Sequence, residues 1–208
     1  MIFTAKNKTA PVILLFITVL LFSSCVDIDT FFSINKNGKT NVILTYVFSS
    51  GFSAFGRGFG ADEPWPFPVT ETDFQSRSVL FPSTEVTSYK VKTKKDGKDI
   101  ITVKLKSDSV ESLSEYLGLD ISVTDPDKKG SGSFQLELPS PYSSLQNNES
   151  LNDLLNMAGD SFISFRIKVP YGIRKVSNGS YKGKTASFSF YLSEYLGNKN
   201  SYNWTVNW

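Results

Sequence analysis

The sequence predicts an α+β domain, mainly antiparallel β-sheet built from hairpins, with two or three short helices on one face. Three observations predict this class. Apolar and polar residues alternate along most of the chain, Asn-Gly and Asp-Gly pairs separate successive alternating runs, and helical spacing is confined to short segments. Alternation is typical of half-buried strands, and Asn-Gly or Asp-Gly supplies the positive φ angles of a tight hairpin turn.

Three hairpins are expected along the chain. The first spans residues 26–48 and turns at Asn37-Gly38, and the second spans about 85–106 and turns at Asp96-Gly97. The third joins Leu119–Val123 to Phe134–Leu138 through a loop at 125–132. Each pairs two runs of strand-forming residues around a Gly-containing connection.

A short helix is expected at about 109–117. Asp108 is its predicted N-cap, Glu111 completes a capping box three residues later, and Gly118 ends it. A second short helix is expected over Leu151–Leu155, ending near Gly159.

The last part of the chain again predicts strands. They lie at 162–169, 173–176 and 185–192, with a turn at Asn178-Gly179 and a final strand over Trp204–Trp208. The aromatic residues between 188 and 208 are interpreted as core rather than as a sugar-binding platform, because large rings dominate buried area in β domains.

Residues 1–24 predict a secretion signal. Lys6 and Lys8 form a positive region, residues 11–22 form an apolar stretch, and Ser23-Ser24 precede Cys25, the only cysteine. A stretch of this length suits a signal peptide and is short for a membrane span of about 20 residues. We therefore expect cleavage between Ser24 and Cys25, acylation of Cys25 by palmitate-like chains, and one β-rich domain over 25–208.

The amino-acid composition excludes several classes of function. The chain of 208 residues has no histidine, so Ser-His-Asp catalysis and zinc sites built from His and Cys are excluded. Lys6 and Lys8 of the signal account for the formal charge of +2, so the mature domain is formally neutral. A neutral domain gives no electrostatic reason to expect nucleic acid as a partner. We expect no enzyme activity, no catalytic residue, no metal and no cofactor.

The order of these motifs resembles the LppM-type bacterial lipoproteins of unknown function. The matching residues are Ile34–Leu44 in the first hairpin, Asp96-Gly97, Phe165–Pro170, Asn178-Gly179 and the Trp-rich end. Residues 22–25 resemble a lipobox, the sequence that lipoprotein signal peptidase recognises. Phe22 occupies the position that is usually Leu, and this departure is similar to the relaxed lipoboxes of spirochaetal lipoproteins. The resemblance implies an α+β domain on a lipid anchor, with affinity for membrane lipids or glycolipids, and no catalytic motif.

A Gly-, Pro- and aromatic-rich loop at 49–68 is the most unusual stretch. Two interpretations stay open: a lip that contacts lipid or glycan, or a loop whose rings pack as satellite core, which base rates favour. The candidate contact residues are Phe52, Phe55, Arg57, Phe59, Trp65 and Phe67.

Charged clusters elsewhere are interpreted as solvated surface. The pairs Asp27/Asp29 and Asp125/Asp127 lack the spacing and third ligand of a calcium loop. The basic run Lys90–Lys98 is interpreted as a solvated strand face, and attraction to anionic headgroups is the alternative.

These observations favour a membrane-anchored, non-catalytic binding module for a lipid, a glycolipid or an envelope partner. The alternatives are a structural or host-facing surface lipoprotein without a small ligand and, last, a carboxylate-based envelope hydrolase. Val26 follows Cys25, so the Asp that retains enteric lipoproteins at the inner membrane is absent. This favours the outer membrane, on its periplasmic leaflet or at the cell surface.

Overall fold

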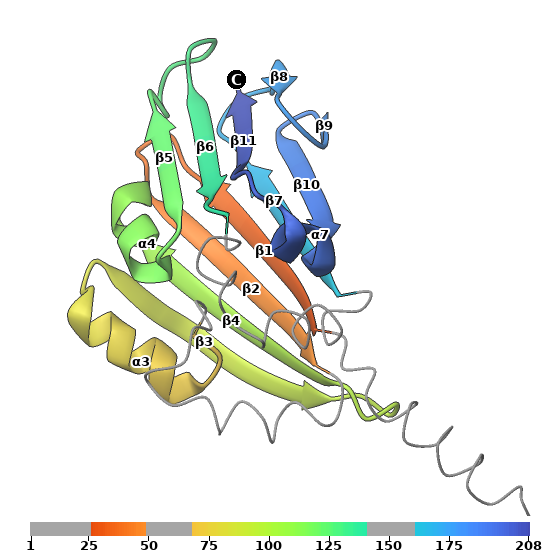
Figure 1. Cartoon of the computed structure of the whole chain (residues 1–208). Coiled ribbons are helices and arrows are strands. Elements are labelled where there is room, and N and C mark those ends of the chain that lie inside the picture. Colours follow the sequence, from red (N-terminus) through yellow and green to blue (C-terminus); the bar gives the residue numbers. More distant parts are fainter. Residues whose placement is uncertain (1–25, 49–67, 141–160) are drawn as a thin grey trace, which may run out of the picture.

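The computed structural model describes residues 26–48, 68–140 and 161–208, whose strands form two sheets (Figure 1). Sheet A has seven strands in the order β3-β4-β2-β1-β7-β10-β9, and sheet B has four in the order β5-β6-β11-β8. The strands of sheet A are β1 (Val26–Ile34), β2 (Thr40–Phe48), β3 (Thr84–Thr93), β4 (Asp99–Ser107), β7 (Phe162–Lys168), β9 (Ser180–Lys182) and β10 (Thr185–Tyr191). Those of sheet B are β5 (Asp120–Thr124), β6 (Ser133–Leu138), β8 (Lys175–Val176) and β11 (Tyr202–Asn207).

Strand β1 lies inside sheet A and is paired on both edges. It runs antiparallel to β2, from Val26 opposite Phe48 to Ile34 opposite Thr40. On its other edge it runs parallel to β7, with Ser33 opposite Lys168. Alternate β1 residues are buried, as the sequence alternation predicts.

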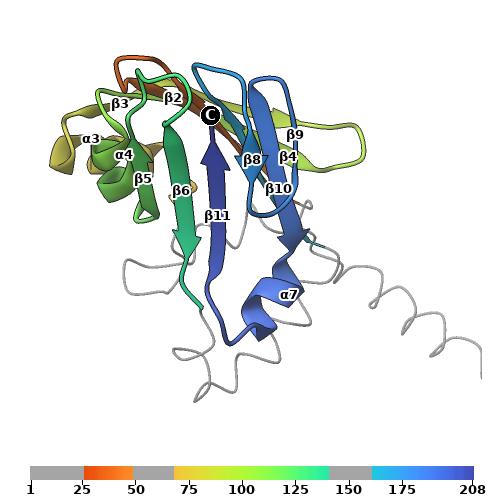
Figure 2. The same cartoon turned by 90° about the horizontal axis from the view of Figure 1, so that it is seen from above.

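The core lies between the two sheets, which pack face to face (Figure 2). Phe32 of β1 contacts Phe134 of β6 with ring centroids 5.7 Å apart, and Trp204 of β11 lies 5.9 Å from Phe188 of β10. These aromatic side chains bury large apolar areas, and each buried side chain contributes roughly 1.5–3 kcal/mol. The interpretation of the carboxy-terminal aromatics as core is confirmed for Phe188, Phe190, Trp204 and Trp208.

The helices cover the same face of sheet A as sheet B does. They are α3 (Glu71–Leu80), α4 (Val110–Leu117) and α7 (Leu192–Gly197). The Tyr116 hydroxyl of α4 donates to the Phe74 carbonyl of α3 at 2.7 Å, and the Arg77 guanidinium of α3 donates back to the Tyr116 carbonyl at 2.7 Å. The two bonds join α3 and α4 into one unit against β3 and β4 (Figure 1). The predicted α+β class, with helices on one face, is confirmed.

The three predicted hairpins are confirmed as β1–β2, β3–β4 and β5–β6. The predicted helix at 109–117 is α4, but its predicted N-cap is wrong by one residue. Ser109 is the N-cap, because its backbone is extended and its Oγ accepts from the Ser112 amide. The Asp108 carboxylate instead pairs with Lys39 at 3.2 Å.

Other boundaries differ from the prediction. Helix α3 was not expected because Phe74 is its one buried residue, so its sequence shows little helical periodicity despite a Thr70/Asp73 capping box. Helix α7, six residues long, was also missed. The strand expected at 173–176 is only β8, and the final strand is β11 followed by a buried Trp208. The helix expected over Leu151–Leu155 lies outside the described residues.

A first prediction concerns Gly179, at the start of β9's hairpin. Gly179 and Gly38 both have φ of 78°, but a Cβ on Gly179 would overlap the Ser187 carbonyl, whereas Gly38 has open space around it. Gly38→Ala should destabilise by about 1–2 kcal/mol through backbone strain alone, and Gly179→Ala by about 1–3 kcal/mol more through the overlap. Urea unfolding of the two variants measures the difference. Equal losses would contradict the close approach to Ser187.

A second prediction concerns Tyr46, whose buried hydroxyl has no hydrogen-bond partner among the described residues. Tyr46→Phe should leave stability unchanged or raise it slightly, whereas Tyr116→Phe breaks a buried bond and should cost about 1–2 kcal/mol.

Burial also raises the pKa of Tyr46 above its ordinary value. The unfolded chain therefore loses this proton first, so the free energy of unfolding should fall as pH rises past about 10. Denaturant titrations at alkaline pH should show a shallower fall for Tyr46→Phe. An identical pH slope in both proteins would contradict the burial of this hydroxyl.

Candidate functional site

The residues singled out in the sequence as contact or processing sites lie outside the described part of the chain. They are Ser24, Cys25, Phe52, Phe55, Arg57, Phe59, Trp65 and Phe67. Whether the aromatic loop is a lip or satellite core therefore stays a prediction.

Asp27 and Asp29 face outward from β1 and both have protein partners. Asp29 accepts two hydrogen bonds from Arg166 of β7, at 3.1 and 2.5 Å, and this pairing raises the pKa of the guanidinium. Asp27 accepts from the Phe162 amide at 3.1 Å. Arg166 also lies over the Phe31 ring, 5.3 Å from its centroid. These carboxylates brace the parallel β1–β7 pair.

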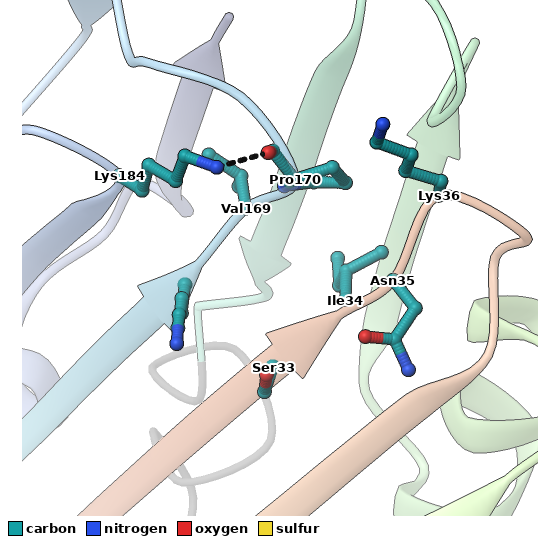
Figure 3. Close-up of a pocket in the computed structure, with 8 residues that line it drawn as sticks. Ser33, Ile34, Asn35, Lys36, Val169, Pro170 and Lys184 are labelled. Carbon is teal, nitrogen blue, oxygen red and sulfur yellow. Dashed lines mark hydrogen bonds between the residues drawn. The ribbon is translucent and has the colours of Figure 1, made fainter.

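A cavity of about 240 Å³ opens at the other end of the same pair (Figure 3). Because β1 and β7 are parallel, their carboxyl ends reach the same edge of sheet A, and such edges are common places for ligand sites. The cavity is lined by Ser33, Ile34, Asn35, Lys36, Lys168, Val169, Pro170 and Lys184.

Local sequence explains the shape of this edge. Strand β1 ends in the Asn35–Gly38 turn, where the Gly38 amide donates to the Asn35 carbonyl at 3.0 Å and φ of Gly38 is 78°. Pro170 ends the run that continues β7, because proline cannot donate to a neighbouring strand. The Lys184 ammonium donates to the Pro170 carbonyl at 2.8 Å and ties the start of β10 to this end.

The charged groups of the cavity are all positive. Lys36, Lys168 and Lys184 line it, and no carboxylate is among its lining residues. Figure 3 shows Lys184 and Pro170 on one rim and Lys36, from the β1–β2 turn, on the other. The Lys36 ammonium lies 5.0 Å from the centre of the Tyr171 ring, which orients it at the rim.

The chemistry available here is recognition of an anion. Lysine ammonium groups bind phosphate and carboxylate oxygens by charge-assisted hydrogen bonds, and Ser33 and Asn35 add neutral polar groups. The volume is below the roughly 300–1,000 Å³ of drug-sized ligand sites, so it suits one small charged group. The lining holds no His or Cys and no carboxylate that could act as a base.

Sequence reasoning did not find this cavity. Lys36 follows a predicted strand, Lys184 precedes one, and Lys168 lies near the end of a third, positions at which exposed lysines are ordinary. The signal that was available is Lys168-Val169-Pro170, a strand closed by proline, but nothing in it identifies β1 as its neighbour. The β1–β7 pairing joins segments 135 residues apart, as the bond from the Val26 amide to Ser161 Oγ also does.

Residues 26–48, 68–140 and 161–208 contain no group of three or more His, Cys, Asp or Glu side chains placed to hold a metal ion. Within the same residues, no helix has both the length and the apolar character needed to cross a membrane.

Comparison with known proteins finds similarity among solved structures. No family model matches the sequence, and no curated protein matches it. Among solved structures, the chain is similar to the folded domain of the Mycobacterium tuberculosis LppM protein, determined by NMR. The TM-score is 0.46 at 9% sequence identity, over 89% of this chain and 90% of that chain.

Proposed function

We propose that this protein is a secreted lipoprotein, held on an envelope membrane by acyl chains at Cys25, whose β domain is a non-catalytic binding module. Its ligand is an anionic group, carried by a lipid, a glycolipid or another envelope component. The observation that carries the binding role is the cavity at the carboxyl ends of β1 and β7, where three lysines line a space that no carboxylate lines.

The start of the fold supports the anchoring role. Val26, the residue after Cys25, is the first residue of β1; it is 5% exposed, and its amide donates to Ser161 Oγ at 2.9 Å. A chain cleaved before Cys25 therefore keeps every described element. Acyl chains contribute about 0.8 kcal/mol per buried methylene, and two or more of them give stable attachment.

The second candidate function is a structural surface lipoprotein without a small ligand. The outward face of sheet A favours it, because most of its side chains are polar and its Asp29–Arg166 pair is already satisfied. The space between the sheets favours it too, since aromatic side chains fill it. Binding measurements at the lysine cavity separate the two functions.

The anchor is tested by metabolic labelling. Cells that express the full chain and are fed labelled palmitate should incorporate label into the protein, and Cys25→Ala should abolish it. Ser24→Ala is the control: it keeps a small residue before the cysteine and should keep the label. Absence of label from the unaltered protein, or label that persists in Cys25→Ala, would exclude acylation at Cys25.

The cavity is tested by native mass spectrometry of the detergent-solubilised full chain with its co-purified lipids. Lys36→Gln combined with Lys168→Gln should lower the bound anionic lipid by about tenfold or more, because a charge-assisted hydrogen bond contributes roughly 1.5–3 kcal/mol. The charge-matched control, Lys129→Gln with Lys175→Gln, should bind as the unaltered protein does. Added inorganic phosphate distinguishes a site for free phosphate, which it occupies, from one that needs the lipid. Equal lipid binding by both variants would favour the second function.

A further inference from the structure

The β3–β4 hairpin carries the densest positive charge in the described chain. Five lysines, Lys90, Lys92, Lys94, Lys95 and Lys98, occur within nine residues. None of the five forms a salt bridge with another described residue.

The two nearby carboxylates are engaged within the hairpin itself. Asp99 accepts from Thr93 Oγ1 at 2.7 Å, and Asp96 accepts from the Lys98 amide at 3.2 Å. The ammonium groups of Lys90, Lys92, Lys94 and Lys95, on residues exposed to solvent, thus remain available to an external anion.

The tip of this hairpin lies at the end of sheet A where β1 begins. Thr93 pairs with Asp99, Asp99 with Phe48, and Phe48 with Val26. The turn at 94–98 therefore extends past Val26, by about 7 Å if two residues project beyond the last pair. Figure 1 shows the tip and the start of β1 at the same corner, and Figure 2 shows both toward the same side.

Exposed apolar side chains accompany the charge at this end. Val91, between two of the lysines, is 56% exposed. On the far side of β1, Phe162 and Tyr191 are 37% and 47% exposed, and their rings meet edge-on with centroids 5.6 Å apart. Basic residues and exposed aromatic rings at one end of a domain are typical of surfaces that lie at a membrane interface.

We propose that the β3–β4 tip is a second membrane contact, which binds the anionic headgroups of the bilayer that holds the acyl chains. This inference rests on the proposed anchor at Cys25. No linker separates that residue from β1, so the corner of the domain that carries the tip is the corner closest to the bilayer. The anchor supplies attachment and the tip supplies orientation. The lysine cavity, at the opposite end of β1, then faces away from this bilayer.

Charge complementarity selects the bilayer over a soluble acidic protein as the partner. Each lysine near an anionic membrane surface contributes about 1 kcal/mol, and the attraction declines within a Debye length of about 8 Å. A surface at the anchored corner of the domain meets the bilayer before it meets any soluble partner.

The test uses the full chain, processed and acylated, and reconstituted into vesicles. Thioether formation consumes the Cys25 thiol, so Lys95→Cys introduces the only free thiol, which is labelled with an environment-sensitive fluorophore. Lys129→Cys is the matched control, since it removes the same charge from the exposed β5–β6 loop, far from the tip (Figure 1). Flotation with the vesicles is scored first, and quenching by neutral acrylamide is then measured.

In vesicles containing phosphatidylglycerol, the probe at position 95 should be quenched about fivefold less than the probe at position 129, the factor that about 1 kcal/mol represents. The difference should disappear in pure phosphatidylcholine. It should also disappear when Lys90→Glu, Lys92→Glu and Lys94→Glu are combined. It should survive Lys175→Glu with Lys182→Glu, which alters lysines away from the tip.

Three outcomes would overturn the proposal, and they are distinguishable. Equal quenching at positions 95 and 129 in protein that floats would exclude the tip contact and leave the anchor intact. Protection that is the same in phosphatidylcholine and insensitive to the glutamate substitutions would exclude headgroup binding. Protein that neither floats nor carries acyl chains would remove the anchor and the tip contact together.

Discussion

Strand β1 is hydrogen-bonded along both edges, antiparallel to β2 and parallel to β7. The pairing with β7 joins the amino-terminal strands β1 to β4 to the carboxy-terminal strands β7, β9 and β10 as one sheet. Side-chain contacts reinforce this pairing, because Asp29 forms an ion pair with Arg166 and Asp27 accepts a hydrogen bond from the Phe162 amide. Without this pairing, the inward residues of the two halves would not form the continuous surface against which sheet B packs.

The parallel pairing also gives the domain two chemically different ends. The carboxyl ends of β1 and β7 border a cavity, and the charged residues that line it are three lysines. At the amino end of β1 lie the residue that follows Cys25, the lysine-rich β3–β4 tip and the exposed Phe162–Tyr191 pair. One strand of nine residues, about 30 Å long, therefore separates the proposed anchoring surface from the proposed binding surface.

The inner face of sheet A is apolar, whereas its outer face is mainly polar. The inner face contributes Phe32, Phe165 and Phe188 to a core completed by Phe134 and Trp204 of sheet B. The outer face carries Phe31 beneath the Arg166 guanidinium and is otherwise mainly polar. Burial of the inner face stabilises the domain without a disulfide, which the single cysteine rules out within the chain. The proposed binding and membrane-contact surfaces accordingly lie at the ends of the strands.

The sequence by itself determined most of the strands, most turns and the fold class, because alternation and Gly-containing turns are local signals; the short strand β9 was not predicted. The hairpins at Gly38 and Gly97 and helix α4 with its Gly118 cap were all predictable in this way. It left out α3, which has one buried residue, and α7, which has none, because such helices show little apolar periodicity. Tertiary structure alone decided the β1–β7 pairing, the two-sheet packing and the cavity that Lys36, Lys168 and Lys184 line. Such contacts depend on burial shared between segments more than a hundred residues apart, and no local pattern of residues encodes which segments become neighbours.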